Sequence, residues 1–169
     1  EFALSFYNLI PSCSFCNSIL KNEKETVLDK HIHPYMDTDA GFEFTYNFIG
    51  KDTDGKNLYG VDCNITAVGI KDKRRVKETL ELFRIKEVYN AHAGLELKDL
   101  IDLATANPGD YIDELVNHVL ANTHLTKEDV FRILFGVETL PNRYLNRPFS
   151  KFKMDIISKI HDIIINGKK

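Results

Sequence analysis

Residues 42–70 read FEFTYNFIGKDTDGKNLYGVDCNITAVGI, and this stretch decides the fold class. From Phe42 to Phe48, aromatic residues alternate with polar ones, which is the period of two that a β-strand requires. The polar run 51–56 contains an Asp-Gly turn signal, and residues 58–70 are rich in β-branched side chains. The pattern predicts a β-hairpin. Because a two-stranded ribbon is only marginally stable alone, we expect it to pack on helices.

The chain beyond residue 71 has the apolar spacing of helices. A Thr-Lys-Glu-Asp sequence at 126–129 resembles a capping box, and Gly136 is a suitable end for the helix that it opens. The predicted helices cover residues 72–91, 96–106, 112–120, 126–136 and 149–167. We expect their apolar stripes to form the core of a bundle.

Composition limits the class of protein. The chain has 169 residues, of which 43% are hydrophobic and 28% charged, values typical of one compact domain. These values exclude a disordered chain, a collagen-like chain and a disulfide scaffold. No apolar run reaches the ~18 residues of a membrane span, and no signal peptide opens the chain. Because the chain begins with Glu1-Phe2 rather than Met, we expect further residues to precede it.

Charge is unevenly distributed along the chain. The net charge is 22 − 25 = −3, but residues 71–86 carry seven basic and three acidic residues, and residues 143–169 carry seven and two. Residues 87–142 between them carry three basic and ten acidic residues. The first basic segment contains four cations that are candidates for contact with nucleic-acid phosphates, Lys73, Arg74, Arg75 and Lys77. The alternative is that they form a solvated helix face.

The least ordinary chemistry lies in the first 18 residues. Cys13 and Cys16 form a C-x-x-C pair, which can supply two of the four ligands of a tetrahedral Zn²⁺ site. Asn17 follows the second thiol, and a carboxamide fixed there could bind Mg²⁺. Asn8 lies in a preceding loop, where its amide could hold another backbone segment. The alternatives are reduced packing thiols, a redox pair, a helix cap at Asn17 and a turn residue at Asn8.

The stretch Tyr7 to Ser18, YNLIPSCSFCNS, resembles the second half of the HNH nuclease motif. HNH enzymes are also called His-Me finger or ββα-metal nucleases. The resemblance is greater to a subgroup of phage-defence and reverse-transcriptase-linked nucleases, which combine Y-N-L-x-P-x-C-x-x-C-N-S with a later H-P-Y, here at 33–35. Segments of that subgroup are also similar to residues 89–92 and 148–151. The strong match covers residues 3–35.

The resemblance implies metal-assisted hydrolysis of a nucleic-acid phosphodiester bond. It assigns structural Zn²⁺ to Cys13 and Cys16, the catalytic divalent metal, Mg²⁺, to Asn17, and orientation of the general base to Asn8. His33 would contact phosphate or support the loop that holds the two zinc-binding thiols. The alternative is a structural role, in which His33 fixes the chain where it leaves the nuclease finger. DNA is the expected substrate, with RNA as the alternative.

The sequence departs from the family pattern before Asn8. The family places an Asp-His pair there, usually with a second C-x-x-C, but residues 1–7 contain no Asp, His or Cys. The missing ligands suggest one internal alternative, a C-x₂-C-x₁₄-H-x-H site completed by His31 and His33. We otherwise expect a C-terminal fragment of a longer nuclease, inactive as it stands because it lacks the general base.

The sequence therefore predicts an α+β protein in three segments. These are a partial zinc-knuckle ββα-metal finger over residues 1–35, a β-hairpin over 36–70 and a mostly α-helical region over 71–169. The helical region would bind substrate or a partner defence protein. The alternative function is a non-catalytic zinc-knuckle module that binds another protein. The absence of an export signal favours reduced thiols and a cytoplasmic location, and Cys63 is expected to be a packing residue.

Overall fold

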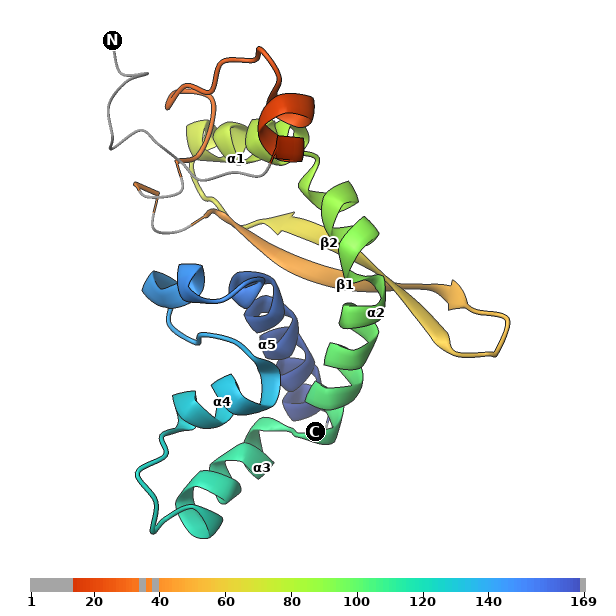
Figure 1. The fold of residues 1–169 in the computed structure, drawn as a ribbon, viewed down its shortest axis with the longest axis vertical. Helices are drawn as coiled ribbons and strands as arrows, with labels where there is room; N and C mark the ends of the chain where they lie inside the picture. Colours follow the sequence, from red (N-terminus) through yellow and green to blue (C-terminus); the bar gives the residue numbers. More distant parts are fainter. Residues whose placement is uncertain (1–13, 34–35, 38–39, 168–169) are drawn as a thin grey trace. The chain divides into compact units, whose positions relative to one another are not determined.

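A computed structural model gives the fold and describes residues 14–33, 36–37 and 40–167. It confirms a mixed α+β chain in which a two-stranded hairpin is followed by helices (Figure 1). The elements, in chain order, are the π-helix η3 (Phe15–Lys21), strands β1 (Phe42–Lys51) and β2 (Asn57–Ile65), helices α1 (Ile70–Leu82), α2 (Ile85–Ala106) and α3 (Gly109–Glu114), the π-helix η4 (Leu115–Val119), helix α4 (Lys127–Phe135), the 3₁₀ helix η5 (Pro141–Asn146) and helix α5 (Ser150–Gly167).

The chain divides into two compact units, each built from two separate stretches of sequence. The first unit comprises residues 1–42 and 65–87, and the second comprises residues 43–64 and 88–169. This grouping differs from the three consecutive segments that the sequence predicts, because contacts join residues that are distant along the chain. In the first unit, for example, the carbonyl of Gly41 accepts hydrogen bonds from the N–H groups of Thr66 and Ala67, at 2.9 and 3.0 Å.

The hairpin forms where the alternation of residues predicts it, and its turn is held by one aspartate. Oδ1 of Asp52 accepts the N–H groups of Asp54 and Lys56 at 2.9 and 2.8 Å. Gly55 adopts a φ of 77°, which a glycine reaches without steric cost. The predicted second strand, residues 58–70, is too long, since β2 ends at Ile65. The chain then turns back to Gly41 and starts α1 at Ile70, so the β-branched residues after 65 do not extend the strand.

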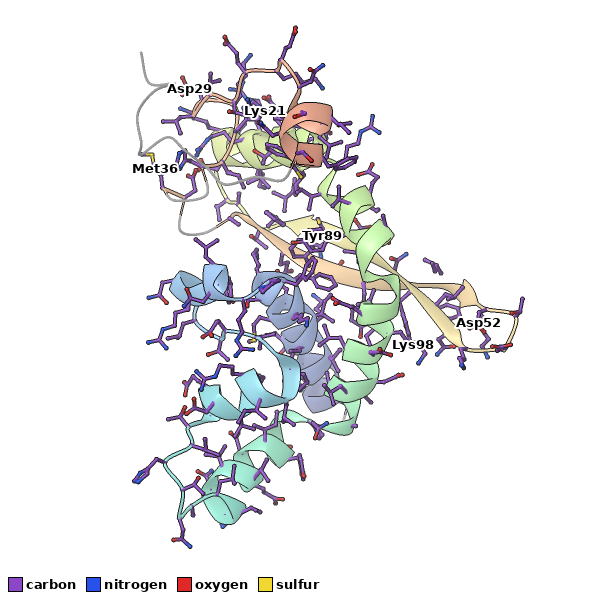
Figure 2. All side chains as sticks on the ribbon, viewed as in Figure 1. Lys21, Asp29, Met36, Asp52, Tyr89 and Lys98 are labelled. Carbon is purple, nitrogen blue, oxygen red and sulfur yellow. The ribbon has the colours of Figure 1, made fainter. Side chains whose placement is uncertain are left out.

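An aromatic cluster fixes the inner half of the hairpin within the second unit. Phe44 of β1 is buried, and its ring centre lies 4.4 Å from that of Tyr89 on α2 and 5.4 Å from that of Phe152 on α5. Tyr89, which is labelled in Figure 2, also contacts Phe152 and Phe149, with ring centres 5.3 and 5.7 Å apart. The ribbon is therefore anchored by helices, as its marginal stability alone requires.

Two polar side chains bind the backbone of the same inner half. Nδ2 of Asn90 donates to the carbonyl of Val61, and the N–H of Val61 donates to Oδ1 of Asn90, both at 2.8 Å. On the other strand, the N–H of Phe44 donates to Oδ2 of Asp155 at 2.9 Å, and Lys151 pairs with the same oxygen at 2.9 Å. Burial is the largest influence on Asp155 and raises the pKa of its carboxyl, despite the bonds from Lys151 and Phe44.

The helices between residues 70 and 106 break at a different place from the one predicted. The sequence predicts helices over 72–91 and 96–106, but α1 ends at Leu82, and α2 then runs without interruption over 85–106. The break falls at Phe83 and at Arg84, whose φ of 45° is left-handed. Neither residue is a glycine or proline, so no local signal marks the break. Gly94 lies inside α2, where a single helical glycine costs only about 1 kcal/mol.

The C-terminal helices follow the predicted signals more closely. Thr126 and Asp129 form the predicted capping box of α4, and Gly136 ends that helix with a left-handed φ of 63°. The predicted third helix forms as α3 followed by η4. The core of this unit contains buried apolar side chains from several helices, including Leu97, Ile112, Phe152, Ile156 and Ile157, and Val137 from the segment that follows α4. None of the helices among the described residues combines the length and apolar character that would let it span a membrane.

The two hydrogen bonds between Asn90 and Val61, here called the Asn90 clamp, give a test of what holds the hairpin. Asn90→Ala would leave the N–H and C=O of Val61 without these partners, so we expect the free energy of unfolding to fall by about 2–4 kcal/mol. Asn57→Ala is the matched control, because the exposed Asn57 carboxamide bonds to the Tyr59 hydroxyl at 3.2 Å, and its loss should cost under about 0.5 kcal/mol. Urea denaturation of both variants measures the difference; equal losses would contradict the clamp.

Candidate functional site

The predicted site residues fall into two groups. Asn8 and Cys13 lie outside the described residues. Cys16, Asn17 and His33 lie in the first unit, together with the four cations of the predicted phosphate-binding cluster. The described part of the predicted site therefore consists of the second thiol, its neighbouring amide and helix α1.

Cys16 and Asn17 occupy the first turn of η3. Cys16 is half-buried and Asn17 is exposed. The helix begins after Ser14, so Asn17 is not its N-terminal cap. The helix ends at Lys21, because Asn22 leaves helical geometry with a φ of 49°, and the N–H of Asn22 returns to the carbonyl of Asn17 at 3.1 Å.

The described residues do not assemble a metal centre. Among residues 14–33, 36–37 and 40–167, no group of three or more His, Cys, Asp or Glu side chains could hold an ion. The predicted zinc knuckle is therefore not supported, although its first thiol, Cys13, lies outside this part of the chain. In the alternative site completed by histidines, His31 uses Nδ1 to accept the N–H of Val27 at 3.3 Å within its own turn.

Arg75 is the centre of an ion-pair network that joins α1 to the segment containing His33. Its guanidinium lies 2.8 Å from Oδ2 of Asp37 and 3.5 Å from Oδ1 of Asp72, and it donates to the carbonyl of His31 at 3.0 Å. The N–H of His33 donates to the same oxygen of Asp37. The side chain of Arg75 is only 13% exposed. These bonds bring together residues that are 38 and 44 positions apart.

The same contacts set the charge state of Asp37. Partial burial acts to raise the pKa of this carboxyl, but the N–H of His33 and the guanidinium of Arg75 outweigh it, and the net pKa is lowered. The Asp37 carboxyl is consequently ionised at neutral pH, and it is paired with the guanidinium of Arg75. This arrangement fixes the backbone at His33.

The remaining three cations of the predicted cluster point outward from α1. Lys73, Arg74 and Lys77 are exposed, whereas Arg75 lies on the buried side of the helix beside Val76. Nε of Arg74 lies 3.6 Å from Glu78, and Nζ of Lys77 lies 3.8 Å from Glu81, both within the same helix. Such exposed ion pairs contribute little to the stability of the fold. The helical period therefore separates one structural arginine from three accessible cations.

A groove that the sequence does not indicate adjoins the Arg75 network. It has a volume of about 350 Å³, and its lining combines the ion-paired Arg75, Asp37 and Asp72 with apolar side chains that include Val68 and Met36. The groove forms from three segments of the first unit that are separated in sequence. No local sequence pattern predicts that these segments come together.

Two segments that resemble the nuclease subgroup, residues 89–92 and 148–151, have a structural role. Tyr89 and Asn90 hold the inner hairpin, as described above. Ser150 is buried, and its hydroxyl accepts the N–H of Glu138 and donates to the carbonyl of Arg147, both at 3.1 Å. Local sequence patterns do not predict the roles of Asn90 and Asp155, because each side chain binds a backbone group that is distant along the chain.

The Arg75 network predicts a clear difference between neighbouring arginines. Arg75→Ala removes several charge-assisted bonds and leaves Asp37 partly buried without its cation, so we expect a loss of about 2 kcal/mol in the free energy of unfolding. Arg74→Ala, one residue away on the exposed face, should cost under about 0.5 kcal/mol. Thermal or urea unfolding measures both. Similar losses from the two variants would rule out the network.

The pH dependence of the same network has a defined sign. Because the pKa of Asp37 is lower in the folded protein than in the unfolded chain, its stabilisation is present above about pH 3.9 and is lost as pH falls through the lowered folded pKa. The stability difference between wild type and Asp37→Asn should therefore be largest near neutral pH and shrink under acid conditions. A difference that stays constant across that range contradicts the assignment.

Comparison with known proteins gives limited information on identity. No family model matches the chain, and no solved structure matches it. The chain is similar to "Protein ea31" of Escherichia phage lambda, with 32% identity over 105 residues, which is 60% of this chain. The match covers 35% of that phage protein, so the chain spans about a third of the length of the curated relative that it matches.

Proposed function

We propose that the chain is the C-terminal part of an HNH-type endonuclease that hydrolyses nucleic-acid phosphodiester bonds with a divalent metal. The observation that carries the proposal is the order of residues in the stretch Tyr7 to Ser18, with His33-Pro34-Tyr35 following it. Three spaced elements agree there, whereas a lone C-x-x-C pair would be weak evidence. The similarity to a phage protein is compatible with a role in phage biology.

The described part of the predicted metal site is incomplete. It contains Cys16 and Asn17, and two adjacent residues do not make a site for either Zn²⁺ or Mg²⁺. In the proposal, Cys13 and Cys16 supply half of a structural zinc site, and the exposed carboxamide of Asn17 is available to a catalytic metal. The remaining ligands and the general base would come from the Asp-His half, which this chain lacks.

The outward face of α1 is the proposed contact with the substrate backbone. Lys73, Arg74 and Lys77 are exposed on this face, and Arg74 and Lys77 make long contacts to carboxylates of the same helix. Arg75 is not included, because its guanidinium is bound by Asp37, Asp72 and the carbonyl of His31. Phosphate contacts of this kind position a nucleic acid without reading its sequence.

The nuclease proposal is tested with the complete coding sequence, including any part upstream of Glu1. We expect that protein to cleave plasmid DNA, or RNA, under Mg²⁺, and Asn17→Ala to slow cleavage by about 100-fold or more, since a metal ligand is lost. Asn22→Gly is the matched control: it removes a carboxamide from the end of the same helix and tolerates the φ of 49° there.

Two outcomes of this assay decide between functions. Unchanged cleavage by Asn17→Ala would remove Asn17 from the metal site. If the complete protein cleaves neither DNA nor RNA, the alternative of a non-catalytic interaction module is favoured and the nuclease proposal fails.

Nucleic-acid contact is tested separately on the 169-residue chain. Replacing Lys73, Arg74 and Lys77 together by Ala should weaken binding to a short DNA duplex and reduce the slope of log affinity against log salt by about 2–3, since each phosphate contact contributes about 0.9. The control is Lys51→Ala with Lys56→Ala, which removes exposed cations from the hairpin loop. An unchanged slope in the triple variant would exclude α1 as the contact surface, whatever the cleavage assay gives.

A further inference from the structure

His161, in the second half of α5, carries a buried nitrogen that is not satisfied by the fold. Its Nε2 is sealed from solvent and forms no hydrogen bond with any described part of the chain. Folded proteins satisfy nearly all of their buried polar atoms, so an exception at a titratable side chain calls for an explanation. At this position the burial of the imidazole and its protonation are in conflict.

The imidazole of His161 joins α5 to two other parts of the second unit. Its ring centre lies 6.3 Å from that of Phe131, a buried residue of α4. Its Nδ1 lies 3.6 Å from the position that a Cβ on Gly109 would occupy, at the start of α3. The second half of α5 thus lies at the corner between α2 and α3 (Figure 1). On α5 itself, the neighbouring Ile157 and Ile160 are buried, so the ring belongs to an apolar contact.

Protonation would disturb this contact. A neutral imidazole carries one N–H and one acceptor nitrogen, whereas an imidazolium carries two N–H donors and a positive charge. Nε2 has no acceptor to receive, and burying an unpaired charged donor costs more than burying a neutral nitrogen. Burial is the largest influence on the His161 imidazole and lowers its pKa, although the backbone groups of Asn107 and Ala104 act to raise it. The folded protein therefore favours the neutral ring.

The charged side chains around His161 do not reverse this preference. Lys127 of α4 lowers the pKa of the imidazole, and Asp162, the next residue of α5, raises it. Asp162 is exposed, so solvent weakens its attraction. On α3, Asp113 forms an ion pair with Lys127, and Asp110 is exposed. The end of α2 faces the ring with backbone groups of its last turn and of the residue that follows it.

From these contacts we infer that His161 makes the packing of the second half of α5, on α4 and on the corner between α2 and α3, sensitive to acid. With a neutral imidazole this part of α5 stays packed. When the ring takes up a proton, the helix separates from its neighbours so that water can hydrate the charge.

The direction of the pH effect follows from the two states of the ring. The imidazole binds a proton more readily in the opened or unfolded chain than in the packed structure. The packing is therefore fully present above about pH 6.5 and is lost as the pH falls below that value toward the lowered pKa of the folded state. All the residues involved belong to the second unit, so the inference does not depend on α1 or on the proposed metal site.

The test is hydrogen exchange of backbone amides in the 169-residue chain at about pH 7.5 and about pH 5, with rates corrected for the intrinsic effect of pH. We expect the protection of amides 157–162 to fall by at least about threefold at the lower pH in the wild type. In His161→Phe, whose ring cannot take up a proton, the fall should be under about 1.5-fold. His124→Gln is the matched control, because His124 is exposed in the loop before α4, and it should keep the wild-type response.

A titration of the His161 ring by NMR completes the test, and its midpoint should lie below about 6.5. A midpoint at or above this value would overturn the inference. So would an equal fall in protection in the wild type and His161→Phe, no fall in the wild type, or loss of the response in His124→Gln. If His161→Phe does not fold, His161→Gln replaces it with the same expected result, and the ring titration needs neither variant.

Discussion

The pairing of the Asn90 carboxamide with both backbone groups of Val61 is the interaction on which the second unit depends. It satisfies a donor and an acceptor of β2 at a point where the strand is covered by α2. The bond from Phe44 to Asp155 does the same for β1 on the side of α5. The aromatic contacts of Tyr89 then fill the space between these polar bonds. A ribbon that would be marginal alone thus becomes part of a helical core.

Features with a local cause could be predicted from the sequence. The hairpin follows from alternation and from its turn, and α4 follows from the capping box at Thr126 and the left-handed Gly136. The break between α1 and α2 could not be predicted, because Phe83 and Arg84 carry no helix-ending signal. The roles of Asn90 and Asp155 were also beyond local patterns, since their partners are 29 and 111 residues away.

At the candidate site, too, local sequence patterns and the folded geometry give different pictures. A run of cations such as Lys73, Arg74, Arg75 and Lys77 reads as one basic cluster in the sequence, but the helical period turns one of them inward to Asp37. The chemistry of the cysteine pair rests on the motif alone, because Cys13 and Asn8 lie outside the described residues. What the structure adds is the accessibility of Asn17 and the fixed backbone at His33.

The long separation between Phe44 and Asp155 has a consequence for how the protein is made. The ribbon leaves the ribosome 111 residues before the helix that holds it. At ordinary rates of elongation this interval is on the order of ten seconds. During that time a nascent strand carrying Phe42, Phe44, Tyr46 and Phe48 has no finished core to enter. Newly synthesised chains therefore depend on being kept apart from one another until α5 has emerged.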